Sequence, residues 1–572
     1  MLLNLTSHSK MRSSACFTKK YTFTAFVNIT MEFAKRCALT IFTILIPMFA
    51  FSQGLDDRIN AWFDPYATAW ENLVFTSIPI GGGLSVPLVL IVLVFGATFF
   101  TLYFRFVNLR LFGLALKVVR GKYDELEGTR KPLIPSVFTV DGDIPDTIKI
   151  EHHQGEVNHF QALSSAVSGT VGLGNIAGVA VAIAVGGPGA TFWMIVAGLL
   201  GMSSKFVECT LGVKYRDIDE KGTVYGGPMY YLKKGLKERG MGGFGKVLAV
   251  VFAILCVGAS FGGGNAFQSN QAAAQVMSSL NITAGYAGAL IGLFFAIITG
   301  VVIIGGIKRI GAVAEKLVPA MAILYVIGSL IVVFVNISFV DEAFMQIING
   351  AFAPAAIGGG ILGVMIQGFR RAAFSNEAGA GSAAIAHSAV NTAYPASEGI
   401  VALLEPFIDT VVICTLTALV IIFYNSGDYF TYGNIVNNSV VMNATGEQLG
   451  GVNLTSTAFE SVIPHFSYIL SVAVILFAFS TILSWSYYGL NAWKYLFGRS
   501  MASDISFKII YLLFVIIGAA VTLDSVIKFS DAMILALVFP NMIGLLLLFP
   551  KVREELNRYL NAIKNYKSTT AR

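Results

Sequence analysis

The stretch from Ser164 to Gly189 reads SSAVSGTVGLGNIAGVAVAIAVGGPG and is apolar enough to lie in a membrane. Glycines and polar side chains crowd into its first half: Ser168, Gly169, Thr170, Gly172, Gly174, Asn175 and Gly178. Glycine costs about 1 kcal/mol relative to alanine inside a helix, and polar side chains in hydrocarbon need hydrogen-bonding partners. The sequence therefore predicts a transmembrane helix broken near Gly169 to Gly174, whose freed N–H and C=O groups face a protein-lined cavity. Transporters bind their cargo at such breaks.

The same glycines allow two other interpretations. Gly174 and Gly178 fit the spacing through which two membrane helices pack closely. A nucleotide-binding loop would need a strand before the glycines and a Lys-Ser or Lys-Thr pair after them, and the sequence has neither. Close packing therefore stays open as the alternative to a binding site, whereas nucleotide binding is excluded.

The composition sets the class of protein. Of 572 residues, 55% are hydrophobic and 13% are charged, and the mean hydropathy is +0.71. Soluble domains carry about 25% charged residues, so the chain is predicted to be a polytopic membrane protein. The cysteines show no paired spacing that would indicate a disulfide framework or a metal knuckle. One cluster allows a metal site, although a solvated loop is favoured there: His152, His153, Glu156 and His159.

Residues 1–53 form a predicted leader. After Met31 come the basic residues Lys35 and Arg36 and then an apolar run that ends in small residues, which predicts a signal peptide over 31–52. An uncleaved anchor is the alternative, and Met31 is a second candidate for the true start. An external segment is predicted at 54–86, with aromatic residues suited to a membrane surface.

Eleven apolar spans are predicted after the leader. An extra transmembrane helix at 87–106 precedes a cytoplasmic insert at 107–159. Ten further spans divide into halves at 160–340 and 341–550, and a cytoplasmic tail covers 551–572. With this count nearly all Lys and Arg residues of the short loops fall on one side, which leaves Arg58 and Lys528 on the other. This bias predicts an external amino end and a cytoplasmic carboxyl end in the cell inner (plasma) membrane.

A second glycine cluster, Gly358 to Gly360, is predicted to interrupt the span at 345–369. Without the extra helix at 87–106, ten spans remain, and the two breaks fall in the first and the sixth. Paired breaks at corresponding positions of two halves are typical of inverted-repeat transporters that bind their cargo at the midplane. The alternative is a chance pairing of glycine-rich helices.

Polar side chains in other spans suggest what such a site would hold. Hydroxyls are clustered near residue 480 at Ser480, Thr481, Ser484 and Ser486, and amides form a row at Asn265, Gln268, Asn270 and Gln271. Hydroxyl oxygens, together with carbonyls freed near Gly169, could coordinate a hard monovalent cation. The alternative is hydrogen bonding between helices. Neither break holds a carboxylate, which suits a small amino-acid zwitterion. Glu405 and Asp409 form either a proton relay or, with more weight, a latch to Arg370 or Arg371.

Several long motifs resemble the signature stretches of the alanine/glycine:cation symporter family. They are GTVGLGNIAGVAVAIAVGGPGA (Gly169 to Ala190), GGPMYYLKKGL (Gly226 to Leu236), GFRRAAFSNEAGAGSAAIAHSA (Gly368 to Ala389), EPFIDT (Glu405 to Thr410) and SWSYYG (Ser484 to Gly489). The resemblance runs from about Val86 to Pro550. The leader, the Gly121 to Asn158 insert and the loop from Asn425 to Pro464 depart from it.

The resemblance implies an all-α fold with a LeuT-like five-plus-five inverted repeat, broken first and sixth core helices and one extra N-terminal helix. It also implies a sodium-coupled alternating-access importer of alanine or glycine, and it makes FSNEAGAG an inner structural gate. Carried over by motif, the substrate-binding residues would be Thr170, Gly172, Gly174, Asn175, Gly359 and Trp485. The sodium-binding residues would be Gly169, Thr481 and Ser484.

Other classes of function remain as alternatives. An ion channel would need a continuous pore, and a transporter of another small solute could be coupled to protons. An intramembrane enzyme is disfavoured because no HExxH or GxSxG motif occurs, and ATP-driven transport is disfavoured because there is no P-loop. The expected partners are the amino acid, the sodium ion and the lipid bilayer. No cofactor and no nucleic acid are expected.

Overall fold

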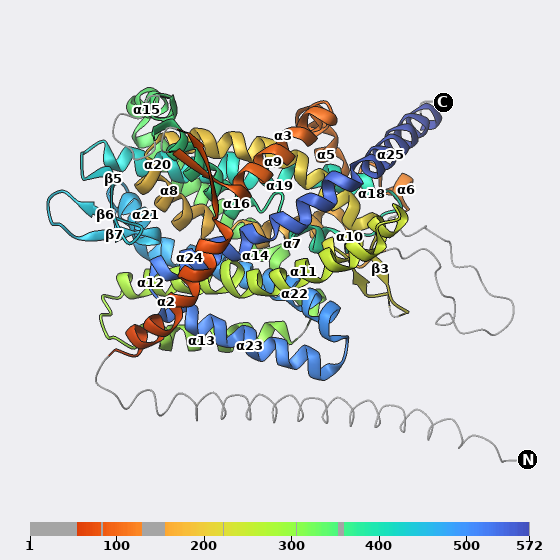
Figure 1. Ribbon diagram of the computed structural model, residues 1–572. Helices are drawn as coiled ribbons and strands as arrows, with labels where there is room; N and C mark the ends of the chain where they lie inside the picture. The colour runs from red at the N-terminus through yellow and green to blue at the C-terminus, as the bar shows by residue number, and fades with distance from the viewer. Residues whose placement is uncertain are drawn as a thin grey trace, which may run out of the picture.

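Helices make up most of the chain in the computed structural model (Figure 1). The structure describes residues 54–81, 84–128, 155–220, 222–304, 306–352 and 360–570. The predicted leader and signal peptide therefore lie outside the described residues. The amino-terminal part comprises α2 (Leu55–Val74), β1 (Ser77–Gly81), β2 (Leu84–Pro87), α3 (Leu88–Tyr103), α4 (Val107–Arg110), α5 (Phe112–Val119) and α6 (Asp124–Glu127).

The first half of the core begins with the stretch that contains the predicted break. Its elements are α7 (His159–Thr170), the π-helical turn η3 (Gly174–Gly178), α8 (Val179–Gly186), α9 (Gly189–Lys214), β3 (Asp217–Ile218), β4 (Val224–Tyr225), α10 (Pro228–Glu238), α11 (Gly242–Phe261), η4 (Gly262–Ala266), α12 (Phe267–Ser279), α13 (Ala287–Ile303) and α14 (Gly306–Val335).

The second half contains more short elements than the first. They are η5 (Ile337–Phe339), α15 (Val340–Phe352), α16 (Gly360–Asn376), α17 (Ala383–His387), α18 (Pro395–Val401), α19 (Leu404–Pro406), η6 (Phe407–Cys414), α20 (Thr415–Asn425), β5 (Phe430–Val436), β6 (Ser439–Met442), β7 (Gln448–Gly450), α21 (Gly451–Glu460), α22 (Phe466–Phe497), α23 (Met501–Ala520), α24 (Leu523–Ala536) and α25 (Val538–Thr570).

Seven described helices are long and apolar enough to cross a membrane, and the α7–α8 pair, bent by 51°, makes an eighth. The shorter α3 and α13 are also apolar. The helix α16 is 17 residues long and carries Arg370 and Arg371. Counting α3, α13 and α16 as spans would give the predicted eleven, and that count stays a prediction. The extra transmembrane helix predicted at 87–106 corresponds to α3 (Leu88–Tyr103).

The interruption predicted within the span at 345–369 has a counterpart in the structure. Two helices occur there, because α15 ends at Phe352 and α16 begins at Gly360. Gly360 is the first residue of α16 and has a positive φ of 59°. That α15 and α16 are the two halves of one broken span stays a prediction. Gly358 and Gly359 lie outside the described residues.

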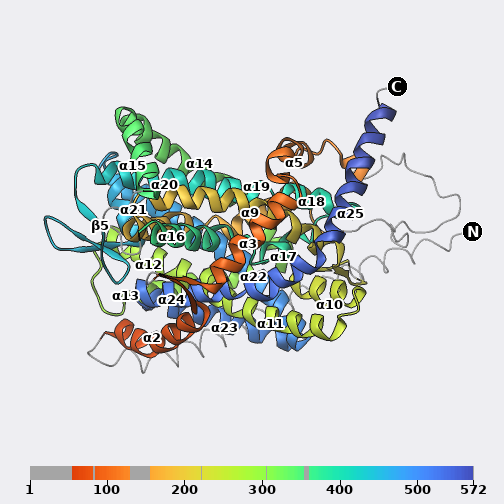
Figure 2. The same ribbon diagram turned by 45° about the horizontal axis from the view of Figure 1, so that its top comes forward.

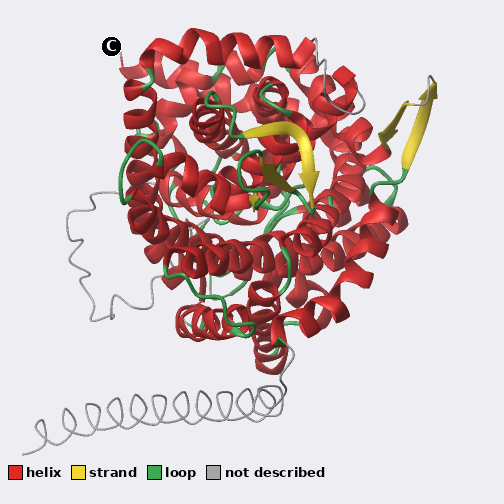
Figure 3. Cartoon of the chain, turned by 90° about the vertical axis from the view of Figure 1, so that its left-hand side faces the viewer, coloured by secondary structure: helices red, strands yellow, loops and turns green. Residues whose placement is uncertain are grey.

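The long helices run between two opposite ends of the molecule (Figures 1 and 2). The sheet β5–β6–β7 and α21 lie at one end, whereas β3, α10 and the carboxyl end of α25 lie at the other. Figure 3 shows that the described strands are small features beside the helical bundle. All three described sheets are antiparallel and have two, two and three strands. The helices therefore supply most of the core.

Side chains from neighbouring segments satisfy the free N–H groups at helix starts. Asn158 and Gln161 form a capping box at the start of α7, with Asn158 Oδ1 accepting from the Gln161 N–H at 2.8 Å. Asp56, in α2, accepts from the N–H groups of Gly288 and Ala289 at 3.0 and 3.1 Å, in the first turn of α13. These contacts fix where α7 and α13 begin and attach α2 to the bundle.

Several charged side chains inside the bundle are paired. Lys205, in α9, donates to Glu405 at 3.0 Å, and both side chains are fully buried. Glu208, three residues farther along α9, accepts from the Gly379 N–H at 2.7 Å. Pairing is expected because an isolated charge is costly in a medium of low dielectric constant.

We expect Lys205→Met to destabilise the protein strongly, because it leaves Glu405 as a buried carboxylate without its ammonium partner. Loss of one partner of a buried pair costs about 3–5 kcal/mol. The double variant Lys205→Met with Glu405→Gln should recover much of the loss, since it removes both charges. Thermal unfolding of the purified protein in detergent measures both effects. A double variant no more stable than Lys205→Met would show that the pairing is not the cause.

Candidate functional site

The first break lies where the sequence predicts it. The helix α7 ends at Thr170 and η3 begins at Gly174, so residues 171–173 connect two helical segments that meet at 51°. Side chains accept the hydrogen bonds that the connection cannot make to itself. The Gly172 N–H donates to Asn175 Oδ1 and the Leu173 N–H donates to Gln268 Oε1, both at 2.9 Å. The connection is buried throughout, so these acceptors replace water.

Gln268 joins the first break to a second irregular segment. Its Nε2 donates to the carbonyl oxygen of Gly263 at 2.9 Å, within the π-helical turn η4. The amide row that the sequence singles out therefore has a definite role at this position, because one side chain satisfies backbone groups of two interrupted helices. Asn270 acts similarly farther along, donating to the carbonyl oxygens of Gly518 and Val521 at 3.0 and 2.6 Å.

Asn175 and Asp409 hold the first break against two other helices. Asn175 Nδ2 donates to Asp409 Oδ1 at 2.6 Å and to its carbonyl oxygen at 3.1 Å. The same carboxylate accepts from Ser375 Oγ, at the end of α16, at 2.9 Å. Sequence reasoning missed Asp409 as part of this site, although EPFIDT contains it. Because its contacts depend on chain segments far apart in sequence, no local pattern indicated them.

The latch predicted from Glu405 or Asp409 to the arginines is wrong. Arg370 is held by Glu71 and Asp531 at 2.7 Å each, and Arg371 pairs with Asp531. Glu405 is held by Lys205 and by His387 Nε2, the latter at 3.3 Å. The carboxylates of EPFIDT thus face the bundle interior, whereas the arginines of α16 face α2 and α24.

The predicted sodium residues lie along the contact between α7 and α22. Ser484 Oγ donates to the Ser165 carbonyl at 3.2 Å, and Ser168 Oγ donates to the Ser480 carbonyl at 3.0 Å. The Thr481 hydroxyl is buried without a hydrogen-bond partner among the described residues. A Cβ atom built on Gly172 would lie 2.5 Å from Thr481 Oγ1, so this hydroxyl adjoins the first break. Gly169 lies against the Tyr488 hydroxyl.

Trp485 is 1% exposed and lies beside η4. A Cβ atom built on Gly264 would lie 2.0 Å from its Cγ atom, so only glycine allows this close approach. The indole Nε1 donates to Glu377 Oε1 at 3.0 Å. Trp485 therefore connects η4 to the end of α16. The Thr170 hydroxyl, in contrast, donates to the Ala166 carbonyl within its own helix at 3.2 Å.

A further interruption in the second half lies at residues 377–382. The helix α16 ends at Asn376 and α17 begins at Ala383. Glu377, Gly379 and Gly381 have positive φ angles of 55°, 91° and 85°, a conformation that glycine adopts without strain. The interruption thus falls in FSNEAGAG, which the sequence analysis assigned to an inner gate. Gly359, predicted to face the substrate, lies outside the described residues.

Phe374 brings the two interrupted helices together and was not predicted. A Cβ atom built on Gly174 would lie 3.3 Å from its ring and 3.7 Å from Ser375 Cα. The ring also meets Phe267 edge to face, with 5.1 Å between the centroids. The end of α16 therefore packs directly on η3. Its place within GFRRAAFSN gave no separate signal, because aromatic residues are common throughout the chain.

The histidine cluster of the sequence analysis does not form a solvated site at His159. This residue is buried, with Nε2 2.5 Å from Glu127 Oε2 and Nδ1 in contact with Glu398. Glu156 Oε1 accepts from the Val224 N–H at 2.6 Å. His152 and His153 lie outside the described residues. Among the residues that are described, no group of three or more His, Cys, Asp or Glu side chains could hold a metal ion.

A buried, bent helix whose connection is hydrogen-bonded by side-chain amides and lies beside hydroxyls, set within a bundle of apolar helices, defines a membrane transport protein. Residues 76–572 match the model of the sodium:alanine symporter family, and the chain belongs to this family. The family consists of transporters, and membership supports a sodium-coupled amino-acid transporter with sodium as a co-transported ion. Multi-pass membrane insertion follows from the same membership and from the apolar helices.

Two relatives illustrate the family. The chain is 36% identical to the sodium/alanine symporter AgcS of Methanococcus maripaludis over 84% of its own length and 95% of that protein. It is 34% identical to a Bacillus subtilis protein named "Probable sodium/glutamine symporter GlnT", over 71% of its length and 79% of that protein.

A crystal structure of a manganese transporter of Eremococcus coleocola is 15% identical, covers 69% of this chain and 82% of its own, and has a TM-score of 0.46.

We expect Gly172→Ala to disrupt the first break. The added methyl group would lie 2.5 Å from Thr481 Oγ1 and 3.0 Å from Gln268 Oε1, the acceptor of the Leu173 N–H. Gly178→Ala is the matched control, since its methyl group would have only Arg371 Nη1 nearby, at 4.0 Å. Gly172→Ala should lower Tm and sodium-coupled amino-acid uptake, and Gly178→Ala should change neither. Equal behaviour of the two variants would contradict this description of the break.

Proposed function

We propose that the protein imports a small neutral amino acid, alanine or glycine, together with sodium by alternating access. The observation that carries this proposal is the first break beside the Thr481 hydroxyl, which has no hydrogen-bond partner within the described part of the chain. A buried hydroxyl without a partner is costly, and a sodium ion would use its oxygen as a ligand. The relative AgcS, named as a sodium/alanine symporter, supports the same pair of cargoes.

The proposed substrate site is formed by the first break and the side chains around it. The amino end of η3 would favour the substrate carboxylate through the partial positive charge of helix N-termini, and carbonyl oxygens freed near the bend would accept from the ammonium group. Thr170, Gly172, Gly174 and Asn175 would line this space. Trp485 would form one wall, and Gly359 is proposed to lie opposite.

A small side chain fits this proposal because the surroundings are crowded. Methyl groups added at Gly169, Gly172 or Gly264 would lie within 3 Å of Tyr488, Thr481 and Trp485 respectively. Close contacts on several sides leave little room beyond the backbone of an amino acid. Glutamine is the most informative competitor, because one relative is named as a probable sodium/glutamine symporter.

Sodium is proposed to bind between α7 and α22, with Thr481, Ser484 and carbonyl oxygens near Gly169 as ligands. Hard cations prefer oxygen ligands, and the Ser484 hydroxyl already lies beside a carbonyl of α7. Such an ion would hold the bent helix against α22. Sodium and substrate would then favour the same state of the protein, which is the thermodynamic requirement for coupling. Each imported charge would contribute about 2.3 kcal/mol at a membrane potential of −100 mV.

The proposed orientation places the β3, α10 and α25 end in the cytoplasm and the β5–β7 end outside. It rests on the positions of the basic residues. The five-plus-five inverted repeat is proposed on two interruptions, one at residues 171–173 and one between the end of α15 at Phe352 and the start of α16 at Gly360. The signal peptide at 31–52 is proposed to be removed.

Proton coupling is the second candidate, because of one observation. A continuous buried chain of imidazole and carboxylate groups runs from Glu127 through His159, Glu398 and His387 to Glu405. Chains of this kind relay protons in pumps and transporters. A proton-coupled protein would accumulate substrate in a pH gradient without sodium.

Reconstituted protein tests the proposed function directly. Radiolabelled alanine should accumulate above equilibrium in proteoliposomes given an inward sodium gradient, and unlabelled glycine should compete. An equal potassium gradient is the control for osmotic and surface effects. Accumulation that follows a pH gradient and not sodium would support the second candidate. Stronger competition by glutamine than by glycine would contradict the proposed substrate class.

Thr481→Val tests the sodium site, because valine keeps the shape of threonine without its oxygen. Half-maximal alanine uptake should then need about tenfold more sodium, equivalent to about 1.4 kcal/mol. Ser480→Ala is the matched control, since Ser480 Oγ donates to the Phe477 carbonyl at 3.0 Å and no role in the site is proposed for it. Unchanged sodium dependence in Thr481→Val would remove this residue from the proposed site.

A further inference from the structure

A basic cleft lies between α10, α11 and the end of α22, far from the first break. Its volume is about 450 Å³, within the range of ligand-binding pockets. Four cationic side chains and two aromatic ones line it: Lys233, Lys246, Lys494, Arg499, Tyr230 and Tyr495. Nothing in the proposed transport cycle uses this cleft. The helix α10, which contributes Tyr230 and Lys233, lies at the β3 end of the molecule in Figure 1.

The cleft keeps an excess of positive charge. Its acid, Asp217, pairs with Lys234. Lys494 is held by Asp504 at 2.8 Å, but this carboxylate also binds Lys508 at 2.6 Å. Lys233, Lys246 and Arg499 have no acidic partner among the described residues. Cations gathered in this way repel one another and favour an anionic ligand.

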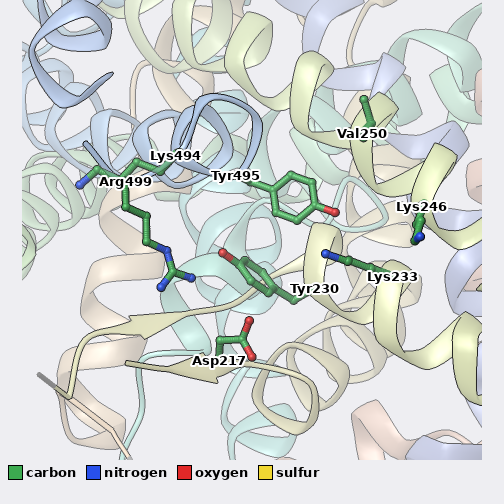
Figure 4. A pocket seen from close by; sticks show the side chains of 9 residues that line it. Asp217, Tyr230, Lys233, Lys246, Val250, Lys494, Tyr495 and Arg499 are labelled. Atoms are coloured by element: carbon green, nitrogen blue, oxygen red, sulfur yellow. The ribbon is translucent and has the colours of Figure 1, made fainter. Parts of the chain in front are cut away.

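The side chains are arranged to surround a ligand. In Figure 4 the Arg499 guanidinium and the Lys233 ammonium group reach toward Tyr230 from opposite sides. The guanidinium lies 3.6 Å from the centroid of the Tyr225 ring, and the Lys233 Nζ atom lies 5.8 Å from that of Tyr495. Aromatic contacts fix the position of both cations without neutralising them. Guanidinium and ammonium groups that remain charged are suited to phosphate oxygens.

An apolar surface continues from the cleft along α11. Val250 lines the cleft and is 42% exposed, Val247 is 60% exposed, and Ile254, one turn farther along, is 56% exposed. Val250 and Ile254 follow Lys246 at intervals of four residues, so all three lie on one side of the helix. A ligand that reaches from the cations along this side meets charge first and then aliphatic surface.

We propose that this cleft binds the phosphate headgroup of an anionic membrane phospholipid, with the acyl chains along α11. A free phosphate would satisfy the cations alone, whereas a phospholipid also covers the apolar surface beside them. Basic pockets between transmembrane helices on the cytoplasmic side are suited to anionic lipid headgroups. The bound lipid would join α10 and α11 to α22, the helix that carries Thr481.

The test uses the full chain purified in an uncharged detergent. Phosphatidylglycerol should raise Tm by a few degrees, and native mass spectrometry should detect the bound lipid. Phosphatidylcholine with the same acyl chains should do neither. In Lys233→Gln/Lys246→Gln the apparent affinity for phosphatidylglycerol should fall about tenfold.

A matched control removes the same charge outside the cleft. Lys237→Gln/Lys551→Gln should bind phosphatidylglycerol like the wild type, and Lys233→Arg/Lys246→Arg should retain binding because both charges are kept. Equal binding of the two phospholipids, or equal loss in the glutamine variant and its control, would overturn the proposal. Inorganic phosphate that stabilises the protein as much as phosphatidylglycerol would show a site for soluble phosphate and would overturn it as well.

Discussion

The structure depends on one constraint, which is that backbone groups released at a bend in a membrane-embedded helix must find partners without water. Asn175 and Gln268 supply acceptors at residues 171–173, and each is itself held in place. Asp409 fixes Asn175, and the Gly263 carbonyl fixes Gln268. The bend is therefore stabilised by a network that reaches α12, α16 and η6. Substitution of any of these partners is expected to destabilise the break.

Buried charged groups also need partners that replace water, and here the partners are groups of opposite charge. From Glu127 to Lys205, acidic groups alternate with histidine and lysine side chains, so that each carboxylate meets a basic group. This chain connects α6, α7, α17, α18 and α19 to α9. Removing one member leaves a charge in a medium of low dielectric constant, so the network is expected to behave as a unit. It gives the short helices of the second half a fixed arrangement that apolar packing alone would not specify.

Sequence patterns predicted those features of the structure that depend on residues close together in the chain. Crowded glycines and polar residues predicted the bend within Gly169 to Gly174, and the motifs indicated the family. The glycine cluster at Gly358 to Gly360 predicted an interruption in the second half, and α15 ends at Phe352 before α16 begins at Gly360. The further interruption at 377–382 was not predicted as a break, because it involves contacts of Glu377 and Gly379 with the distant Trp485 and Glu208. The partners of Asp409, Arg370 and Lys205 were beyond prediction for the same reason, since each lies far away in sequence.

Asp409 accepts hydrogen bonds from Asn175 on the bent helix and from Ser375 at the end of α16. One carboxylate thus connects two segments that are about two hundred residues apart in the chain. Separating the two segments breaks at least one of these buried hydrogen bonds, and such a loss is costly inside the bundle. We therefore expect the bent helix and the end of α16 to move together as one rigid body.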